Sequence, residues 1–375
     1  MMEQIVISGT GVFTPEQSIT NEELVKAYNE YAEKFNLSNK QDIDSGKTDA
    51  LEPSNEEFIF NASGIKNRYV MDKEGILDPE IMHPILDRRS DDQPSILAEM
   101  SIKAAEKALH EAGKTANDID AVITACSNLE RAYPAISIEV QELLGIEGFA
   151  FDMNVACSSA TFAIQAAADM IRSGSAKTIL IVDPEICSGH LDFKDRDCHF
   201  IFGDVCTAMI LERKDTAESK NCFEILSTKC ITQFSNNIRN NFGFLNSAKK
   251  SSPLDRDLLF MQQGRKVFKE VVPMVSKLIT DHLDEENIQT KEIKRLWLHQ
   301  ANKSMNDLIG KKVLGRTPEK HEQPNILQDY ANTSSAGSII AFSKFSDDMN
   351  KSEIGVLCSF GAGYSAGSIS LKKTY

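Results

Sequence analysis

Short apolar runs alternate along the chain with segments in which apolar residues recur every three or four positions. The runs are typical of buried strands, and the periodic segments are typical of amphipathic helices. Strands are predicted at residues 5–11, 121–125, 149–156, 178–182, 208–211, 224–230, 295–298, 355–357 and 368–371. Helices are predicted at residues 96–112, 136–144, 158–173, 267–283 and 332–345. This alternation predicts an α/β protein with mainly buried sheets.

One polar stretch interrupts the alternation between about residues 29 and 95. It is rich in Asn, Asp, Lys and Glu and contains Pro53, Pro79 and Pro84. Residues 22–35, around its beginning, are compatible with a helix, whereas much of the remainder is predicted to be loop. A loop of this length in a compact domain is usually a functional cap or a disordered insertion, and we expect one of these two.

The two halves of the chain repeat the same order of elements. Small-residue segments occupy matching places at residues 157–160 and 332–336. We therefore predict a duplicated α/β unit with a break near residue 215. The N-terminal half would span residues 1–215 and carry the polar insertion, and the C-terminal half would span residues 216–375.

Composition restricts the class of protein and its surroundings. The 375 residues are 41% hydrophobic and 26% charged, as in an ordinary globular protein. The net charge of −14 opposes binding to nucleic acid. Residues 1–4 lack the basic start of a secretory leader, and no apolar run is long enough to span a membrane. With eight scattered cysteines, which are typical of reduced thiols, these features predict a cytoplasmic protein.

Cys157 stands where a predicted strand runs into a predicted helix. The free N–H groups and the dipole of a helix N-terminus stabilise a thiolate relative to a thiol, which suits a nucleophile. A cysteine is nevertheless more often a buried structural residue than a nucleophile. Evidence from other residues is therefore needed to distinguish the two roles.

Three further segments supply groups that a cysteine nucleophile can use. His299 follows the strand at residues 295–298, and Asn332 stands at the start of another predicted helix. Residues 361–363 form a flexible turn whose backbone N–H groups could bind a developing oxyanion. Alone, His299 fits a core histidine and Asn332 fits a helix N-cap. Together with Cys157 they form a Cys–His–Asn set beside an oxyanion turn.

These segments make the sequence resemble the β-ketoacyl-acyl carrier protein synthase III family of the thiolase superfamily. The most specific part is His-Gln-Ala-Asn at 299–302, followed thirty residues later by Asn-Thr-Ser at 332–334. Residues 63–68, 202–204 and 264–269 support it. The resemblance covers nearly the whole chain outside the polar stretch. It implies a thiolase-like fold, in which two duplicated α/β halves form αβαβα layers.

The resemblance implies a decarboxylating condensation between an acyl thioester and malonyl-acyl carrier protein in fatty acid biosynthesis. Cys157 would carry the acyl group, and the N–H groups of Cys157 and Ala362 would form the oxyanion hole. His299 and Asn332 would assist decarboxylation and stabilise the enolate oxygen that results. No metal or other cofactor is implied, because coenzyme A or phosphopantetheine thioesters are the substrates and loss of CO₂ generates the carbanion.

The resemblance also implies residues that contact the substrates. These would be Tyr133, Phe58, Asn302, Gly361 and Gly363. Tyr133 would enter the acyl pocket of the neighbouring copy in a homodimer and limit the length of the acyl chain. Phe58 and Ala62 stand where the family often has the Trp and Arg that enclose the adenine of coenzyme A. A donor bound to a carrier protein is therefore an alternative to a coenzyme A donor.

Basic residues near the predicted active site match the place where the family binds its acyl carrier protein. They are Lys303, Lys311 and Lys312, and Arg265, Lys266 and Lys269 would extend the same patch. Acyl carrier proteins are acidic, so a chain with a net charge of −14 needs such a local patch to attract one.

Other interpretations stay open. The long first hundred residues are also typical of relatives that serve specialised lipid or polyketide pathways. A thiolase would use a second cysteine near Cys358, and a chalcone-synthase-like enzyme would share the Cys–His–Asn set, but the string at 299–302 fits synthase III better. A zinc site is imaginable from residues whose spacing matches no regular pattern: Cys187, His190, Cys198 and His199. An inactive partner subunit would be expected to lose its nucleophile, whereas Cys157 is present.

Overall fold

The computed structural model describes residues 3–90, 92–241, 243, 252 and 255–375. Nine strands join in the order β11-β12-β13-β8-β1-β7-β6-β4-β5. Their bounds are β1 Ile5–Phe13, β4 Ala121–Ala125, β5 Phe149–Met153, β6 Thr178–Glu185, β7 Val205–Arg213, β8 Phe223–Ser235, β11 Ile293–Leu298, β12 Ile354–Gly361 and β13 Gly363–Lys373. Two small ribbons accompany them, formed by β2 Gln17–Thr20 with β3 Asn67–Val70 and by β9 Ile238–Arg239 with β10 Met261–Gln262.

The helices lie between these strands in sequence. They are α1 Asn21–Ser38, α2 Lys40–Asp44, α3 Glu56–Ser63, α4 Glu74–Leu77, α5 Ile96–Ala112, α6 Ile136–Leu144, α7 Ser159–Ser173, α8 Gly264–Glu285, α9 Lys303–Leu314, α10 Leu327–Tyr330 and α11 Ala336–Lys344. The α/β alternation predicted from the sequence is confirmed, and most boundaries differ from the prediction by a few residues.

The sheet consists of two groups of strands with the same topology. In the first half β1 pairs antiparallel with β7, β7 antiparallel with β6, and β6 parallel with β4. In the second half β8, β13, β12 and β11 repeat those three relationships in the same order. The groups join between β1 and β8, where Val6 pairs with Glu224 and Ile7 with Phe223. The repeat confirms two duplicated α/β halves, whereas the break near residue 215 stays a prediction.

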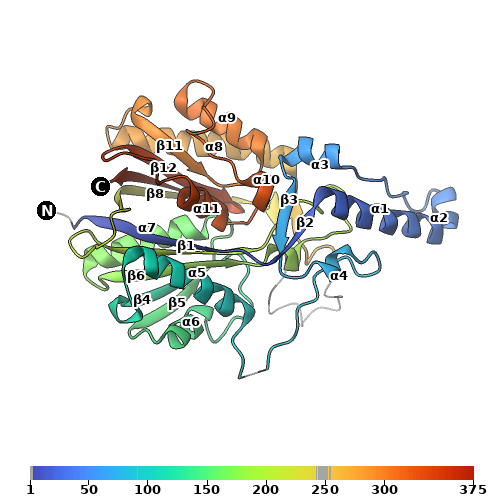
Figure 1. Ribbon diagram of the computed structural model, residues 1–375. Helices are drawn as coiled ribbons and strands as arrows, with labels where there is room; N and C mark the ends of the chain where they lie inside the picture. The colour runs from blue at the N-terminus through green and yellow to red at the C-terminus, as the bar shows by residue number, and fades with distance from the viewer. Residues whose placement is uncertain (1–2, 91, 242, 244–251, 253–254) are drawn as a thin grey trace.

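The two groups of strands enclose a central pair of helices. Both α7 and α11 contact strands of each half, whereas α5 and α6 cover the outer face of the first half and α8 and α9 that of the second. Figure 1 shows the resulting order of helix, sheet, helix, sheet and helix from bottom to top. This is the αβαβα arrangement predicted from the sequence.

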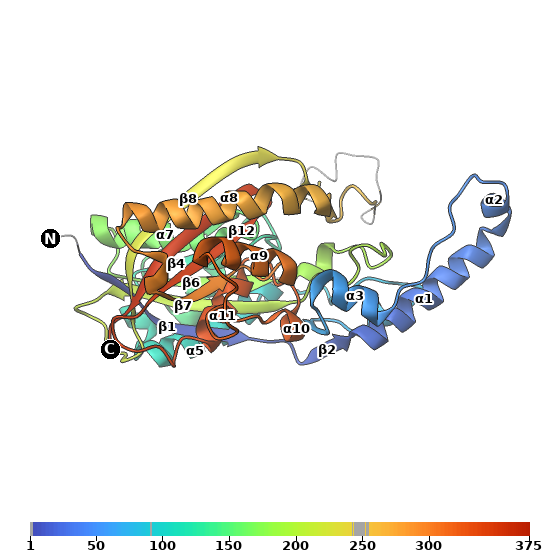
Figure 2. The same ribbon diagram turned by 90° about the horizontal axis from the view of Figure 1, so that it is seen from above.

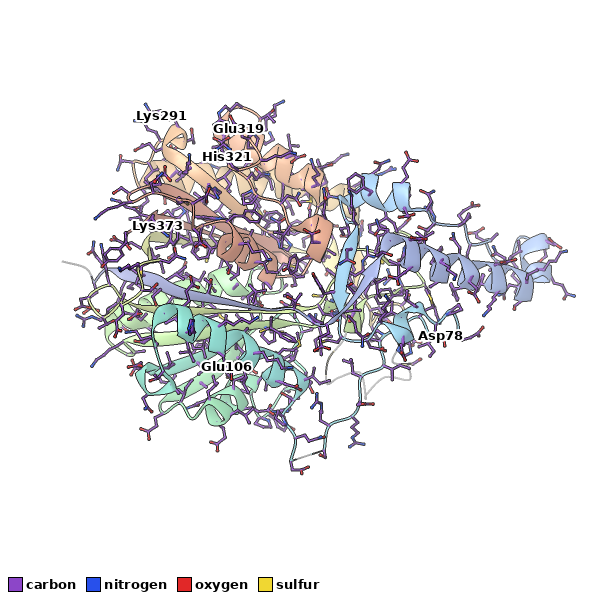
Figure 3. The ribbon with its side chains drawn as sticks, viewed as in Figure 1. Asp78, Glu106, Lys291, Glu319, His321 and Lys373 are labelled. Carbon is purple, nitrogen blue, oxygen red and sulfur yellow. The ribbon has the colours of Figure 1, made fainter. Side chains whose placement is uncertain are left out.

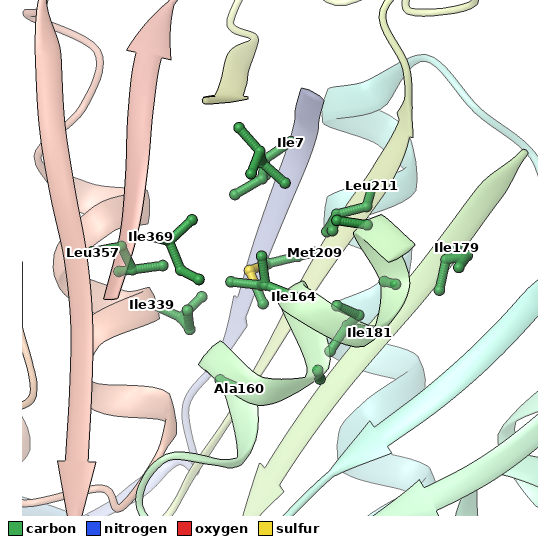
Figure 4. Close-up of a cluster of buried hydrophobic side chains, with 14 of the residues drawn as sticks. Ile7, Ala160, Ile164, Ile179, Ile181, Met209, Leu211, Ile339, Leu357 and Ile369 are labelled. Atoms are coloured by element: carbon green, nitrogen blue, oxygen red, sulfur yellow. The ribbon is translucent and has the colours of Figure 1, made fainter. Parts of the chain in front are cut away.

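Small and branched apolar side chains pack the middle layer against both groups of strands. Figure 4 shows Ala160 and Ile164 of α7 beside Met209 and Ile181 from the first half, with Ile369 from the second. These side chains are fully buried. Alanines on α7 let the helix approach both sheets closely, so the start of α7 is fixed relative to both halves of the chain.

The polar stretch is more ordered than the sequence indicated. It contains α1 to α4 and β3, and Figure 2 shows α1 extending away from the sheets. Asparagine side chains bind the returning chain to α1: Asn36 exchanges two hydrogen bonds with the backbone of Leu51, and Asn29 exchanges two with Ser54. The helix expected around residues 22–35 is present as α1, and much of the remainder is loop as expected, interrupted by α2, α3, β3 and α4.

Charged side chains lie on the outside of both halves. Figure 3 shows Glu106 on α5 and Lys291 and Glu319 in the second half, and all three are exposed. Within the described ranges, no helix is both long enough and apolar enough to cross a membrane.

Candidate active site

A cavity of about 280 Å³ lies where the two halves of the chain meet. Cys157 from the first half lines it together with His299, Asn302, Asn332 and Gly361 from the second. The structure therefore brings together five of the residues that sequence reasoning assigned to the site. The rest of the wall is largely apolar, with Phe200, Phe202, Phe260, Phe268 and Phe360 among its residues.

Cys157 sits on a tight turn between β5 and α7. The preceding residue, Ala156, has a φ of 48°, a left-handed conformation that is strained for a residue with a side chain. Ser159 stabilises this turn, because its Oγ accepts the Val155 N–H at 2.9 Å and donates to the Ala156 carbonyl at 2.7 Å. A Cβ on Gly361 would stand 2.5 Å from the Cys157 Cβ, so glycine is required there.

Burial decides the protonation state of Cys157. It raises the pKa of the thiol to about 11, and the negative charge of Glu185 acts in the same direction. The Ser334 hydroxyl, 3.5 Å from the Cys157 Sγ, and the backbone N–H groups of Ala362 and Cys157 oppose the rise. The helix N-terminus was expected to stabilise a thiolate, whereas in the free protein desolvation outweighs these donors and raises the pKa of the thiol.

Asn332 belongs to a turn and not to a helix start. The turn from 332 to 335 precedes α11, because Ser334 has a φ of 51° and cannot continue a helix. The backbone of Asn332 forms a bridge with Phe202 of the other half, through Asn332 N to Ile201 O at 3.0 Å and Gly203 N to Asn332 O at 3.1 Å. The two halves thus fix this residue jointly.

The side chain of Asn332 is oriented by the same turn. Its Oδ1 accepts the Ser334 N–H at 2.9 Å. The Nδ2 amide is then the hydrogen-bond donor that this side chain can offer to a substrate oxygen in the cavity.

His299 follows β11 at the edge of the cavity. The backbone N–H of His299 donates to the Cys358 carbonyl at 2.7 Å. The imidazole ring stands edge-on to Phe360, with 5.1 Å between the ring centroids. Burial lowers the pKa of the imidazole to about 3, so the ring is neutral at physiological pH. A neutral imidazole carries one N–H donor, as hydrogen bonding to a developing oxyanion requires.

Asn302 connects the cavity wall to the cap. Its Oδ1 accepts the N–H groups of Ser304 and Met305 at the start of α9, and its Nδ2 donates to the Ala62 carbonyl at 2.6 Å. Because α3 carries Ala62 and Ser63 into the wall of the cavity, the polar stretch contributes part of the site.

Several predicted site residues lie outside this cavity. Gly363 and the side chain of Ala362 lie at a separate surface depression beside Ala156 and Phe234, although the Ala362 N–H reaches Cys157. Tyr133 is 85% exposed. Phe58 packs edge-on against Phe200, with 5.8 Å between centroids, and does not line the cavity.

Two residues near the site were missed from the sequence. Arg196 stacks its guanidinium 4.1 Å from the centre of the Phe58 ring, and its Nε donates to the Pro53 carbonyl at 2.8 Å. Ser334 contacts the nucleophile itself. Its position directly after Asn-Thr was the available signal, whereas no local pattern pairs Arg196 with Phe58.

The lysines assigned to carrier docking lie on one helix. Lys303 begins α9 and is paired with Asp307 at 2.5 Å. Lys311 and Lys312 are exposed in its last turn, and within the described ranges neither forms an ion pair.

The described residues include no group of three or more His, Cys, Asp or Glu side chains arranged to hold a metal ion. The four residues considered for zinc make separate contacts. His199 stacks on Tyr28 with 4.8 Å between centroids, and the Asn128 side chain contacts His190.

Comparison with known proteins shows which families and sequences this chain resembles. Residues 151–233 match the 3-oxoacyl-[acyl-carrier-protein] synthase III family, and residues 283–373 match the C-terminal part of the same family. A β-ketodecanoyl-[acyl-carrier-protein] synthase of Pseudomonas aeruginosa is 59% identical over 349 residues, covering 93% of this chain and 100% of that protein. A β-ketoacyl-[acyl-carrier-protein] synthase III of Clostridium perfringens is 28% identical over 380 residues, covering 99% and 100%.

Solved structures show the same fold. A 3-oxoacyl-[acyl-carrier-protein] synthase III from Aquifex aeolicus superposes with a TM-score of 0.76 at 24% identity, covering 98% of this chain and 99% of that one. The priming β-ketosynthase of the R1128 polyketide pathway gives 0.78 at 21% identity, covering 100% and 97%. The thiolase-like fold predicted from the sequence is confirmed.

The raised pKa of Cys157 predicts how the thiol reacts with iodoacetamide. Because the thiolate is the reactive form, alkylation should be slow at neutral pH and rise about tenfold per pH unit towards pH 11. Ser334→Ala removes a donor to the sulfur and should slow the reaction further. Mass spectrometry of the Cys157 peptide measures the rate. A rate that levels off near neutral pH would contradict the burial argument.

Proposed function

We propose a reaction for this chain, which belongs to the 3-oxoacyl-[acyl-carrier-protein] synthase III family: it joins a medium-chain acyl thioester to malonyl-acyl carrier protein with release of CO₂. Enzymes of this family are acyl-condensing transferases. One observation carries the assignment of the residues, namely that Cys157, His299 and Asn332 come from separate elements and line one cavity.

The length of the donor follows from the name of the 59% identical relative. That protein is named for a β-ketodecanoyl product, which has ten carbons. Decarboxylation of a malonyl group leaves two carbons to be added, so its acyl donor has eight. We propose an eight-carbon donor for this chain as well, and the aromatic wall of the cavity is suited to an alkyl chain.

The first half of the reaction transfers the acyl group to Cys157. The sulfur attacks the thioester carbonyl, and the carbonyl oxygen gains negative charge as the C–S bond forms. The backbone N–H groups of Cys157 and Ala362, which point at the sulfur in the free enzyme, are placed to donate to that oxygen. The C–S bond to the carrier then breaks, and the carrier thiol leaves with the proton of Cys157.

The second half uses His299 and Asn332. The malonyl carboxylate leaves as CO₂, and the electron pair of the broken C–C bond moves into an enolate at the thioester. The neutral imidazole of His299 and the Nδ2 amide of Asn332 donate hydrogen bonds to the enolate oxygen. The enolate carbon attacks the acyl carbonyl, the bond to Cys157 breaks, and the Cys157 thiolate that leaves takes up a proton from water. The electron pair comes from CO₂ loss, so these steps use no metal or redox cofactor.

Substitution at His299 or Asn332 separates the two halves of the reaction. His299→Ala and Asn332→Ala should each lower decarboxylation of malonyl-carrier protein by about a hundredfold or more, because one enolate donor is lost. Transfer of an eight-carbon acyl group to Cys157 should fall by less than about tenfold. Release of CO₂ and labelling of Cys157 measure the two steps. Equal loss of both would show that these residues activate the thiol.

The exposed loop at Tyr133 supports a homodimer. A tyrosine side chain that is 85% exposed is typical of a residue that a partner buries. We propose that Tyr133 enters the cavity region of a second copy and limits acyl length. Tyr133→Ala should shift preference towards longer donors, and Tyr375→Ala, at another exposed tyrosine, should not. A monomeric mass in light scattering would exclude this arrangement.

The C-terminal turn of α9 is proposed to bind the acidic carrier protein. Lys311→Glu with Lys312→Glu should raise KM for malonyl-carrier protein several-fold at low salt, because like charges repel. Acylation of Cys157 by small thioesters should be unchanged. The effect should shrink at high salt, since surface attraction is screened.

A matched control reverses the same charges elsewhere. Lys177 and Lys220 are exposed at the opposite ends of the strands from the cavity. Lys177→Glu with Lys220→Glu should leave carrier kinetics unchanged. If both double variants raise KM equally, net charge and not docking at α9 is the cause.

A further inference from the structure

Two fully buried carboxyl groups lie directly behind the site. Asp183 and Glu185 end strand β6, and neither is exposed to solvent. In the described part of the chain, the arginine and lysine ion pairs involve other carboxylates. A buried carboxylate without a cation is costly, so the pair needs hydrogen bonds or a proton to be stable.

Ser335 bridges the pair and fixes its protonation. Its Oγ lies 2.6 Å from Asp183 Oδ1 and 3.0 Å from Glu185 Oε1. A hydroxyl has one proton and can donate to one of these oxygens. The other contact is favourable only if that carboxyl is protonated and donates to the Ser335 Oγ. One shared proton on the two carboxyls, with one negative charge, satisfies both contacts at once.

The bridging serine is part of the active-site turn. Ser335 follows Ser334, whose hydroxyl contacts the Cys157 sulfur. The Ser334 N–H in turn donates to the Oδ1 of Asn332. The Ser335 N–H also donates to Glu185 Oε1 at 3.4 Å. On the other side Ser127 donates its N–H and its hydroxyl to Glu185 at 3.1 and 2.5 Å. Glu185 thus connects the turn to the chain that follows β4.

We propose that Asp183, Glu185 and Ser335 form a one-proton network that holds the turn from 332 to 335 in place, so that the two carboxyls act as positioning residues for Asn332 and Ser334. The proposal rests on the proposed function of Asn332. It also predicts an electrostatic effect, because the single negative charge of the network acts on the neighbouring Cys157 thiol.

The surroundings keep the proton on the network. Burial raises the pKa of both carboxyls, and the negative charge of Glu185 raises the pKa of Asp183 further. The other titratable groups that face the pair are thiols. Cys126 and Cys187 lie 4.0 and 3.9 Å from Glu185 Oε2, and Cys206 of β7 and Cys157 lie nearby. Burial raises the pKa of these thiols, so they remain uncharged; the Asp204 carboxyl lies beyond Cys187.

Amide substitutions test the charge without changing shape. Asp183→Asn keeps one charge on Glu185 and a donor for Ser335, so Cys157 alkylation at neutral pH should stay within about twofold of the native rate. Asp183→Asn with Glu185→Gln removes the charge, and alkylation should become about three- to tenfold faster. The alkylation rate is measured without an acyl substrate. A purely structural role of the two carboxyls would not predict that the double variant reacts faster than the single variant.

Serine substitutions test the positioning. Ser335→Ala removes the bridge, and malonyl decarboxylation should fall on the order of tenfold or more because Asn332 is no longer fixed. Ser338→Ala is the matched control: Ser338 lies in the first turn of α11, which begins directly after Ser335, is equally buried and forms a hydrogen bond of 2.7 Å with Ser359, away from the pair. It should keep the native rate.

Two results would overturn the network. One is a double amide variant that folds and is alkylated at Cys157 at the native rate. If that variant does not fold, a tenfold change in the alkylation rate of Asp183→Asn alone would overturn the network instead. The other is an equal loss of decarboxylation in Ser335→Ala and Ser338→Ala. If the native protein does not condense at all, the proposed function fails, and the alkylation rates still decide whether the network exists.

Discussion

The packing of one half of the chain against the other holds the reacting groups together. Cys157 belongs to the first half, and His299 and Asn332 belong to the second. Two close contacts set their separation: Gly361 lies against Cys157 without room for a Cβ, and the backbone of Asn332 bridges to Phe202. Since α7 and α11 pack between both sheets, a shift of either half would displace the nucleophile from its partners.

The apolar environment of the cavity sets the chemistry as much as the catalytic groups do. Burial holds the pKa of Cys157 near 11 and that of His299 near 3, so both are uncharged in the resting enzyme. In the proposed reaction, charge develops at a carbonyl or enolate oxygen, next to N–H donors of the protein. Ala156, Ala331 and Ser334 have positive φ values and stand next to Cys157 or close to Asn332 in the sequence. This strained backbone helps to orient the hydrogen-bond donors of the site.

The sequence predicted those features that depend on local pattern. Apolar periodicity predicted the strands and helices of both halves, and the strings at 299–302 and 332–334 predicted the Cys–His–Asn set. Prediction from the sequence failed where contacts between distant segments determine the local structure. The bridge between Asn332 and Phe202 prevents a helix from starting at Asn332, and the contact between Phe58 and Arg196 joins residues far apart in the sequence. The pairing of Asp183 with Ser335 has no sequence signature either, because each residue alone fits an ordinary strand or helix start.

Cys157 is the residue proposed to carry the acyl group. The most direct measurement incubates the native protein with an eight-carbon acyl thioester, without malonyl-carrier protein, and maps the modified peptide by mass spectrometry. One acyl group is expected on Cys157, and it should disappear when malonyl-carrier protein is added. An acyl group on another of the eight cysteines, or condensation that persists in Cys157→Ala, would contradict this role of Cys157.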